Sequence, residues 1–161
     1  MKEIASNIKY ATYLDKFEVV SFIEKCLFEN KLGFFPLSND EDLSFFDKIY
    51  TSDNMLVFKI NGKLVGTIAY IIEERNKIKS VKIVRFYLDS SIKGKGYGKI
   101  LLMTLLSIIR IKYYEIKIAY LTTNSEKMKI AYNMYKSFGF EESKDFKISL
   151  KRSNVLLKLQ L

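Results

Sequence analysis

The residues with the clearest chemical potential are three glycines that alternate with lysines in the segment KGKGYGK at positions 93–99. A glycine has no Cβ atom, so the backbone N–H groups of such a segment can approach an anion closely. The N-terminus of a following helix would attract the same negative charge, and the lysines add positive charge. The segment therefore predicts a phosphate-binding turn, with a flexible turn that merely needs glycine as the alternative. Its residues are Lys93, Gly94, Lys95, Gly96, Tyr97, Gly98 and Lys99.

The spacing of these glycines does not fit the familiar phosphate loops. From Gly94 to Gly98 the segment is one residue too short for GxxxxGK, and Ile100 stands where that pattern needs Ser or Thr for magnesium. The segment also lacks the GxGxxG order of dinucleotide-binding folds and the GxxG clamp of some nucleic-acid-binding domains. Spacing alone thus excludes these three classes of site.

The apolar pattern around the turn predicts the elements that must position it. A β-rich run over 80–88 precedes the turn, an almost continuously apolar helix runs from Gly98 to about Ile111, and a strand over 117–122 follows. A strand, glycine-rich turn, helix and strand in this order are typical of a parallel crossover.

Upstream of the turn, the strongest short-range signal is Asn61-Gly62 between two β-rich runs. These runs, Met55–Ile60 and Lys63–Ile72, predict a hairpin, because a type I′ turn needs a positive φ angle at both central residues. The strand over 80–88 is predicted to pair antiparallel with this hairpin.

Two helices are predicted before the hairpin. The first runs from about Asp15 to Asn30 and carries Cys26 on its apolar stripe, where it is predicted to be a core residue. The second runs to about Tyr50, and its start is predicted from the capping-box spacing of Ser38 and Glu41.

The last part of the chain predicts one more helix and two strands. Thr123 and Glu126 have the spacing of a capping box at the start of that helix, and Gly139 is placed to end it in a left-handed conformation. Phe140–Leu161 is predicted to form the two strands.

Two segments together resemble the GNAT superfamily of N-acyltransferases. The acyl-CoA-binding motif of that family is Arg or Gln, two residues, Gly, one residue, and Gly or Ala. Here it falls on Lys93, Gly96 and Gly98, with Lys in place of Arg or Gln. The stretch AYNMYKSFGF at 131–140 resembles the family's AxxxYxxxGF segment, and the hairpin with Gly66 in its second strand fits the family's second and third strands.

The resemblance implies an α/β fold of the GNAT type in a single domain over residues 1–161. That fold has a mixed, mostly antiparallel, twisted sheet of about six or seven strands flanked by about four helices. The resemblance further implies acetyl-CoA (coenzyme A) as cosubstrate and no metal. Its reaction would be acetyl transfer to a primary amine by direct attack in a ternary complex, without a covalent acyl-enzyme.

The resemblance also implies roles for individual residues. Phe86 and Leu88 would contact the cofactor, and the backbone N–H of Leu88 would stabilise the oxyanion. Tyr135 would protonate the departing thiolate. A phenol of pKa about 10 is a competent donor to a thiolate whose conjugate acid has a pKa of about 8.5. The alternative is that Tyr135 only completes the apolar face of its helix.

The general base is the part of the site that the resemblance leaves open. Some members of the family use a glutamate on the strand before the pyrophosphate loop, but here that strand carries Lys82 and Arg85 and no acid before Asp89. Glu73 or Glu74, at the end of the preceding strand, is a substitute. A chain of waters, or an amine that arrives neutral, is the other solution.

A second departure from the family concerns the cofactor contacts after the last crossover. Met128 replaces an Asn that often touches CoA, and Asn124 is predicted to take over that contact. Lys127 and Lys129 are candidates for the 3′-phosphate, or else form a solvated helix face.

The acceptor side is the least defined part of the predicted site. Phe34 and Phe35, in the connection GFFPL, would form an apolar wall of the acceptor pocket or anchor the first two helices to the sheet. The acceptor itself would be a small-molecule amine or a protein or peptide amine. The apolar C-terminal strand also offers a surface for a homodimer.

Composition excludes several other function classes. The 161 residues contain no His and one Cys, so the chain has no Ser–His or Cys–His pair, no His-liganded zinc and no intramolecular disulfide. The single free thiol suits a cytoplasmic location. No apolar run approaches the ~20 residues that a membrane span needs, so no membrane partner is predicted.

The formal net charge of +9 raises a nucleic-acid-binding alternative. The basic residues are scattered among acidic ones, however, so a nucleic-acid partner is not predicted. A CoA-binding regulatory or adaptor protein that has lost turnover is the other alternative, motivated by the missing glutamate and by Met128. It would bind acetyl-CoA without acetylating an amine.

Overall fold

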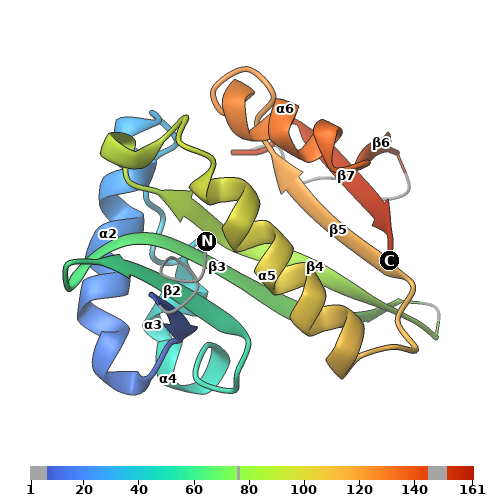
Figure 1. Ribbon diagram of the computed structural model, residues 1–161, viewed down its shortest axis with the longest axis horizontal. Helices are drawn as coiled ribbons and strands as arrows, with labels where there is room; N and C mark the ends of the chain where they lie inside the picture. The colour runs from blue at the N-terminus through green and yellow to red at the C-terminus, as the bar shows by residue number, and fades with distance from the viewer. Residues whose placement is uncertain (1–6, 76, 145–151) are drawn as a thin grey trace.

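A twisted seven-stranded sheet organises the chain, with strand order β1-β2-β3-β4-β5-β7-β6 (Figure 1). The computed structural model describes residues 7–75, 77–144 and 152–161, so part of the predicted Phe140–Leu161 strand pair lies outside the described residues. All neighbouring strands are antiparallel except β4 and β5, which are parallel. The strands are β1 Ile8–Tyr10, β2 Met55–Ile60, β3 Lys63–Arg75, β4 Ile78–Leu88, β5 Ile118–Thr123, β6 Glu141–Ser143 and β7 Val155–Gln160.

Helices cover both faces of this sheet. The helices are α2 Lys16–Glu29, α3 Glu41–Ser44, α4 Phe46–Ile49, α5 Tyr97–Lys112 and α6 Lys129–Ser137, with short 3-10 helices η1 Tyr13–Asp15 and η2 Ser90–Ile92. One hydrophobic core lies under α5 and α6, and a second lies under α2, α3 and α4. Leu56 and Phe58 of β2 face the first core, whereas Met55 and Val57 face the second, as expected for a strand buried on both faces. The predicted GNAT-type mixed sheet is confirmed.

The predicted hairpin is present in the structure. Asn61 and Gly62 have φ angles of 50° and 76°, the positive values that a type I′ turn needs. The predicted antiparallel pairing of the following strand is also present, because β4 pairs with β3.

The predicted parallel crossover runs from β4 through α5 to β5 (Figure 1). Helix α5 packs across the sheet through an almost continuous set of buried residues: Gly98, Leu101, Leu102, Leu105, Leu106 and Ile109. Its nearly continuous apolar sequence therefore reflects burial on one broad face.

The predicted single helix to Tyr50 is wrong, and so is its capping box. The segment forms two four-residue helices, α3 and α4, with a break at Phe45. Asp40 rather than Ser38 precedes α3, and its carboxylate does not cap that helix. It accepts a hydrogen bond from the Phe35 N–H at 2.7 Å, so the residue that could cap the helix stabilises the preceding loop.

The capping box predicted at Thr123 and Glu126 is also wrong. Asn124 Oδ1 accepts hydrogen bonds from the N–H groups of Glu126 at 3.2 Å and Lys127 at 2.9 Å, so a turn intervenes and α6 begins only at Lys129. Gly139 ends α6 as predicted, with a φ angle of +90°.

The C-terminal strand β7 lies inside the sheet. It pairs with β5 along its length and with β6 at Leu156–Lys158, so it is an interior strand of the described sheet. Within the described ranges, no helix is both long and apolar enough to cross a membrane.

Candidate functional site

The site begins where strands β4 and β5 separate. These two parallel strands pair only at Val81–Ala119 and Lys82–Tyr120. Beyond these pairs the second half of β4 keeps its antiparallel contact with β3 but has no partner in β5. A wedge therefore opens between the two strands, with unpaired β4 backbone along one side.

A β-bulge at Arg85 shapes the open half of β4. The pairing with β3 shifts from Ala69–Val84 to Thr67–Tyr87, so an extra residue is accommodated in β4. Arg85 has a φ angle of 55°, which is uncommon for a residue with a side chain. The buried Thr67 hydroxyl stabilises it by donating a hydrogen bond of 2.8 Å to the Arg85 carbonyl.

The Leu88 backbone N–H points into this wedge. The Asp89 N–H donates to the Val65 carbonyl at 2.8 Å, while Gly66 lies opposite Leu88. In an antiparallel pair this pattern makes Gly66–Leu88 a non-hydrogen-bonded pair, so the N–H of Leu88 faces away from β3. The geometry is that required of the predicted oxyanion donor.

A groove of about 550 Å³ continues from the wedge along the glycine-rich turn to α6. Its walls come from the end of β4, the turn before α5, and the start of α6. The lining side chains and glycines include Phe86, Tyr87, Leu88, Lys93, Gly94, Gly96, Gly98, Lys99, Lys127, Met128, Lys129, Ile130, Ala131, Met134 and Tyr135. Most of the residues that the sequence predicts to bind the cofactor thus lie together.

Two of the turn glycines are required by their backbone conformation. Gly94 and Gly96 have φ angles of 78° and 84°, and a Cβ atom at either position would meet nothing within 4 Å. The space beside them is therefore open to a ligand. Gly96 is also the N-cap of the 16-residue helix α5, whose first N–H groups have no intrahelical acceptor. The open glycine backbone and the unpaired N–H groups of α5 are the features on which the predicted phosphate-binding turn depends.

Gly98 is glycine for a different reason. A Cβ atom there would lie 3.0 Å from a Leu88 methyl group and 3.2 Å from the Met134 sulfur. The missing side chain lets the start of α5 pack closely between β4 and α6. This close packing closes the floor of the groove.

An ion pair attaches the turn to α2. The buried Asp89 carboxylate accepts hydrogen bonds from Lys25 at 2.8 Å and from the Ser91 N–H at 3.0 Å. The hydrogen bond from Lys25, followed by those from Ser91, holds the pKa of Asp89 well below its ordinary value. Asp89 therefore fixes the path of the chain between β4 and the glycine-rich turn.

The lysines of the site divide into two groups. Lys93, Lys99, Lys127 and Lys129 line the groove, whereas Lys95 is exposed outside its lining. Lys127 also donates to the Lys31 carbonyl at 2.8 Å, which connects the start of α6 to the end of α2.

Tyr97 contributes to the site only through its backbone at the start of α5. Its ring turns into the core, with its centroid 5.4 Å from that of Phe58.

Tyr135 lies where the groove meets the wedge. Its ring packs between Phe86 and Phe140, with centroid distances of 6.0 and 5.8 Å, and only 5% of the residue is exposed. Burial, and to a smaller degree the neighbouring Tyr87, raises the pKa of the Tyr135 phenol. The hydroxyl thus stays protonated near neutral pH, and the acid role of Tyr135 stays a prediction.

A second, smaller cavity of about 80 Å³ lies within the wedge. It shares Phe86, Tyr87, Met128 and Tyr135 with the groove, so the two cavities meet at Tyr135. Its remaining lining residues include Arg85, Leu121, Thr123, Asn124, Arg152 and Ser153.

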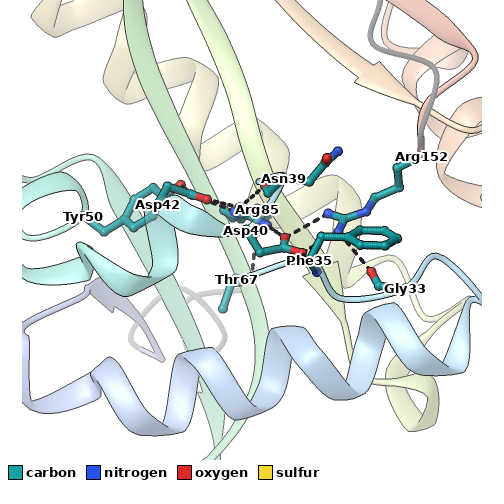
Figure 2. Close-up of polar contacts among 9 residues, drawn as sticks. All are labelled: Gly33, Phe35, Asn39, Asp40, Asp42, Tyr50, Thr67, Arg85 and Arg152. Atoms are coloured by element: carbon teal, nitrogen blue, oxygen red, sulfur yellow. Dashed lines mark hydrogen bonds and ion pairs between the residues drawn. The ribbon is translucent and has the colours of Figure 1, made fainter. Parts of the chain in front are cut away.

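A buried ionic network forms one wall of the smaller cavity (Figure 2). Asp40 is fully buried and accepts hydrogen bonds from Arg85 Nη1 at 2.7 Å and Arg152 Nη1 at 2.9 Å. Asp42 accepts from Arg85 Nε at 2.9 Å and from the Tyr50 hydroxyl. Two arginines are therefore balanced by two carboxylates.

The network fixes Asp40 as an anion. Burial alone would raise the pKa of Asp40, but the hydrogen bonds from Arg152, the Phe35 N–H and Arg85 outweigh it and hold the pKa below its ordinary value. An acid in this state holds the two arginines in place and does not accept a proton near neutral pH.

The structure does not bring Glu73 and Glu74 to this site. Glu73 lies seven positions along β3 from Gly66, which is opposite Leu88, and this is about 23 Å at roughly 3.3 Å per residue. Glu73 accepts a hydrogen bond from the Tyr120 hydroxyl, which offsets the effect of burial and lowers its pKa. Both predicted bases lie at the far end of the sheet.

Asn124 lies beside the smaller cavity, outside the groove lining. Its side-chain oxygen holds the turn before α6, and its side-chain nitrogen donates to the Arg152 carbonyl at 3.1 Å. Its amide is thus used within the protein. Met128, which stands in place of the family's Asn, lines both cavities.

The two predicted acceptor-wall phenylalanines lie near the network. The Phe35 ring lies 5.6 Å from the guanidinium of Arg152, which lines the smaller cavity (Figure 2). Phe34 packs against the core under α2. Neither residue lines the groove or the smaller cavity; Phe35 packs beside Arg152, and Phe34 packs against the core.

The sequence interpretation missed Asp40 and Arg152 as members of the site. Asp40 stands in a polar loop and Arg152 in a basic segment, so neither is distinguished by its neighbours. Arg85 did carry a signal, because a charged residue inside the apolar run IVRFYL needs a buried partner. The identity of that partner depended on the fold.

Comparison with known families identifies this architecture. Residues 20–140 match the acetyltransferase (GNAT) family. The chain therefore belongs to the GNAT family, as the glycine-rich turn and the AxxxYxxxGF segment predicted. No curated protein matches the sequence.

Solved structures with the same fold are acetyltransferases. A GNAT-family acetyltransferase from Staphylococcus aureus MU50 matches with a TM-score of 0.80 and 23% identity, over 96% of this chain and 98% of that one. A predicted acetyltransferase with acetyl-CoA from Clostridium acetobutylicum matches with a TM-score of 0.71 and 17% identity, over 88% and 94%. Arabidopsis thaliana Naa50, in complex with the bisubstrate analogue CoA-Ac-MVNAL, matches with a TM-score of 0.67 and 18% identity, over 96% and 97%.

Proposed function

We propose that this GNAT protein transfers the acetyl group of acetyl-CoA to a primary amine by direct attack. One observation carries the proposal: the wedge between β4 and β5 opens onto the glycine-rich turn, and Tyr135 lies where the two meet. The turn and the groove lysines suit a polyanionic nucleotide, and the unpaired β4 backbone suits an extended, amide-containing chain. Acetyl-CoA has both parts.

The chemistry follows from the groups at the junction. The amine nitrogen forms a bond to the acetyl carbonyl carbon, and the carbon–sulfur bond breaks to release the CoA thiolate. The Leu88 N–H would stabilise negative charge on the carbonyl oxygen, and the protonated Tyr135 hydroxyl would supply a proton to the thiolate. A backbone donor is fixed by the sheet and needs no reorganisation during the reaction.

The proton lost by the amine leaves through solvent in this proposal. Asp40 and Asp42 are engaged by arginines, and Glu73 lies at the far end of β3. An amine that arrives neutral, or one whose proton is relayed through water, requires no carboxylate base. We therefore expect the rate to rise with pH until the bound amine is largely neutral.

The direct test measures release of free CoA thiol from acetyl-CoA with a panel of primary amines, alongside thermal melting with and without acetyl-CoA. An enzyme shows both thiol release and an acetyl-CoA-dependent rise in melting temperature. A CoA-binding adaptor shows only the second, which would refute acetyl transfer. Absence of both would refute the assignment of the groove.

Two further expectations accompany this proposal. We propose that residues 1–161 act as one domain, because Gly33 and Arg152, which are 119 positions apart in the sequence, contact one another at the site. We also propose a cytoplasmic location, where the buried free thiol of Cys26 would remain reduced.

A further inference from the structure

We propose that Arg152 recognises an acyl oxygen next to the acceptor amine, so that the acceptors are α-amines that carry a neighbouring carboxylate or carbonyl group. This inference rests on the proposed acetyl transfer and specifies its second substrate. The shared chemistry is that of an α-amino acid and of the first residue of a peptide.

The first observation is an unused hydrogen-bond donor on Arg152. Its Nη1 and Nη2 atoms donate to the Asp40 carboxylate, and Nη2 also donates to the Gly33 carbonyl at 3.0 Å (Figure 2). Its Nε atom is buried and has no partner among the described residues. Buried N–H groups nearly always have an acceptor, so this one indicates an oxygen supplied from outside the chain.

The second observation is the position of the Arg152 residue. Arg152 lines the small cavity in the wedge, and Tyr135 lines the same cavity where it meets the groove. An acceptor whose amine lies at the Tyr135 end therefore has its adjacent atoms beside Arg152. The cavity of about 80 Å³ has room for a small polar group and little room for a long chain.

The third observation is that Arg152 is held rigidly. Both of its terminal nitrogens are engaged, and the Phe35 ring lies 5.6 Å from its guanidinium. A donor fixed in this way loses little conformational entropy when it binds a ligand oxygen. A lysine at this position would lack the planar, preoriented Nε–H.

The charge balance of the network selects the kind of group that is recognised. Asp40 and Asp42 compensate Arg85 and Arg152, so the wall is neutral as a whole and presents a donor rather than an excess positive charge. Such a wall binds a carbonyl oxygen as well as a carboxylate. A polyamine offers neither oxygen and leaves the Nε–H unpaired.

The test compares acceptors that share one carbon skeleton: isopropylamine, L-alaninamide, L-alanine and a peptide that begins with alanine. The variants are Arg152→Lys, which keeps a cation beside Asp40, and Arg152→Gln. Arg110→Gln, on the exposed end of α5, is the matched control. The quantity measured is kcat/KM for each oxygen-bearing acceptor divided by kcat/KM for isopropylamine.

We expect the wild-type protein and Arg110→Gln to prefer the oxygen-bearing acceptors. Loss of one hydrogen bond to a charged donor should reduce that preference about tenfold or more in Arg152→Lys, mainly through KM. General damage to the fold would lower all four rates together and leave the ratio unchanged. Thermal melting of each variant with acetyl-CoA separates such damage from lost recognition.

The outcomes separate this inference from the proposed function. Faster acetylation of L-alanine than of the peptide identifies free amino acids as the acceptors, and the reverse order identifies peptide N-termini as the acceptors. An unchanged ratio in Arg152→Lys, or equal use of isopropylamine by the wild type, overturns the inference while acetyl transfer stands. If no amine is acetylated although acetyl-CoA raises the melting temperature, the proposed function fails and the inference fails with it.

Discussion

The groove at the glycine-rich turn and the small cavity at Arg152 meet at Tyr135, but they are built from different parts of the chain. The groove takes most of its lining from the end of β4, the adjoining turn and the start of α6. The wall of the cavity joins Asp40 from a loop, Arg85 from a strand and Arg152 from the last segment of the chain. Local sequence thus specifies the proposed cofactor side, and tertiary structure specifies the proposed acceptor side.

This difference predicts opposite responses to mutation. Substitutions in the cavity wall should affect folding as well as acceptor choice, because their partners are distant in sequence. Substitutions in the glycine-rich turn should change only the affinity for acetyl-CoA. The largest effect is expected in the wall.

Asp40→Ala should cause the largest loss of stability. It leaves Arg85 and Arg152 buried without their shared carboxylate, and breaking a buried ion pair in this way costs about 3–5 kcal/mol. Chemical denaturation measures the free energy of unfolding. Asp47→Ala removes an exposed carboxylate and should cost about 0–1 kcal/mol. Equal losses in the two variants would contradict a structural role for the network.

The same network gives a pH dependence. The pKa of Asp40 in the folded protein lies below its ordinary value. The Asp40 carboxylate therefore contributes fully to stability above its unfolded-state pKa of about 4, and this contribution is lost as the pH falls through the folded-state pKa. The difference in stability between wild type and Asp40→Ala should therefore be constant near neutral pH and narrow only in acid. If the difference in stability already narrowed on lowering the pH to about 6, which is roughly two units over the unfolded-state pKa, Asp40 would not be held as an anion.

Tyr135→Phe tests the junction between the two regions. The change removes one hydroxyl and keeps the ring contacts with Phe86 and Phe140, so kcat should fall about a hundredfold or more while acetyl-CoA affinity is retained. Steady-state kinetics and calorimetric binding measure the two quantities. Tyr114→Phe, at an exposed tyrosine, is the control. Unchanged turnover in folded Tyr135→Phe would assign that ring to packing alone.

Gly96→Ala should weaken acetyl-CoA binding by about 5- to 30-fold, because a left-handed conformation costs a residue with a Cβ atom about 1–2 kcal/mol and the turn would relax. Gly62→Ala carries a similar strain at φ 76° in the hairpin, outside the groove lining. It should reduce stability without changing acetyl-CoA affinity. Parallel effects of both variants on affinity would show that the turn has no special role.

The smallest effect is expected for Glu73→Gln. Glu73 pairs with Tyr120, Arg75 and Lys82 at the far end of the sheet, so kcat should change by less than about twofold. The pH–rate profile should also be unchanged. A loss of the rising limb of that profile would restore Glu73 as the base.

Local signals predicted most of the fold correctly. Asn61-Gly62 fixed the hairpin, Gly139 the end of α6, and the unbroken apolar run the burial of α5. The two capping boxes failed for a common reason. In each, a neighbouring side chain, Asp40 or Asn124, formed a loop hydrogen bond that a spacing rule does not consider.

The candidate site was predictable only on the side of the glycine-rich turn. The groove residues from Lys93 to Gly98 follow from short-range spacing, because a turn and the helix after it are formed by adjacent residues. The acceptor wall was not predictable, since its ion pairs join residues 45 and 112 positions apart. A single sequence carries no pattern for such distances.

The single cysteine has a consequence for measuring motion at the site. The Cys26 sulfur lies 3.8 Å from the Leu88 carbonyl, and burial, with a smaller effect of Glu29, raises the pKa of its thiol to about 12. An alkylating reagent can therefore react only when α2 separates from β4. The rate of alkylation would report how often α2 separates from the Leu88 end of β4, with no probe introduced, and acetyl-CoA bound against Leu88 should slow it.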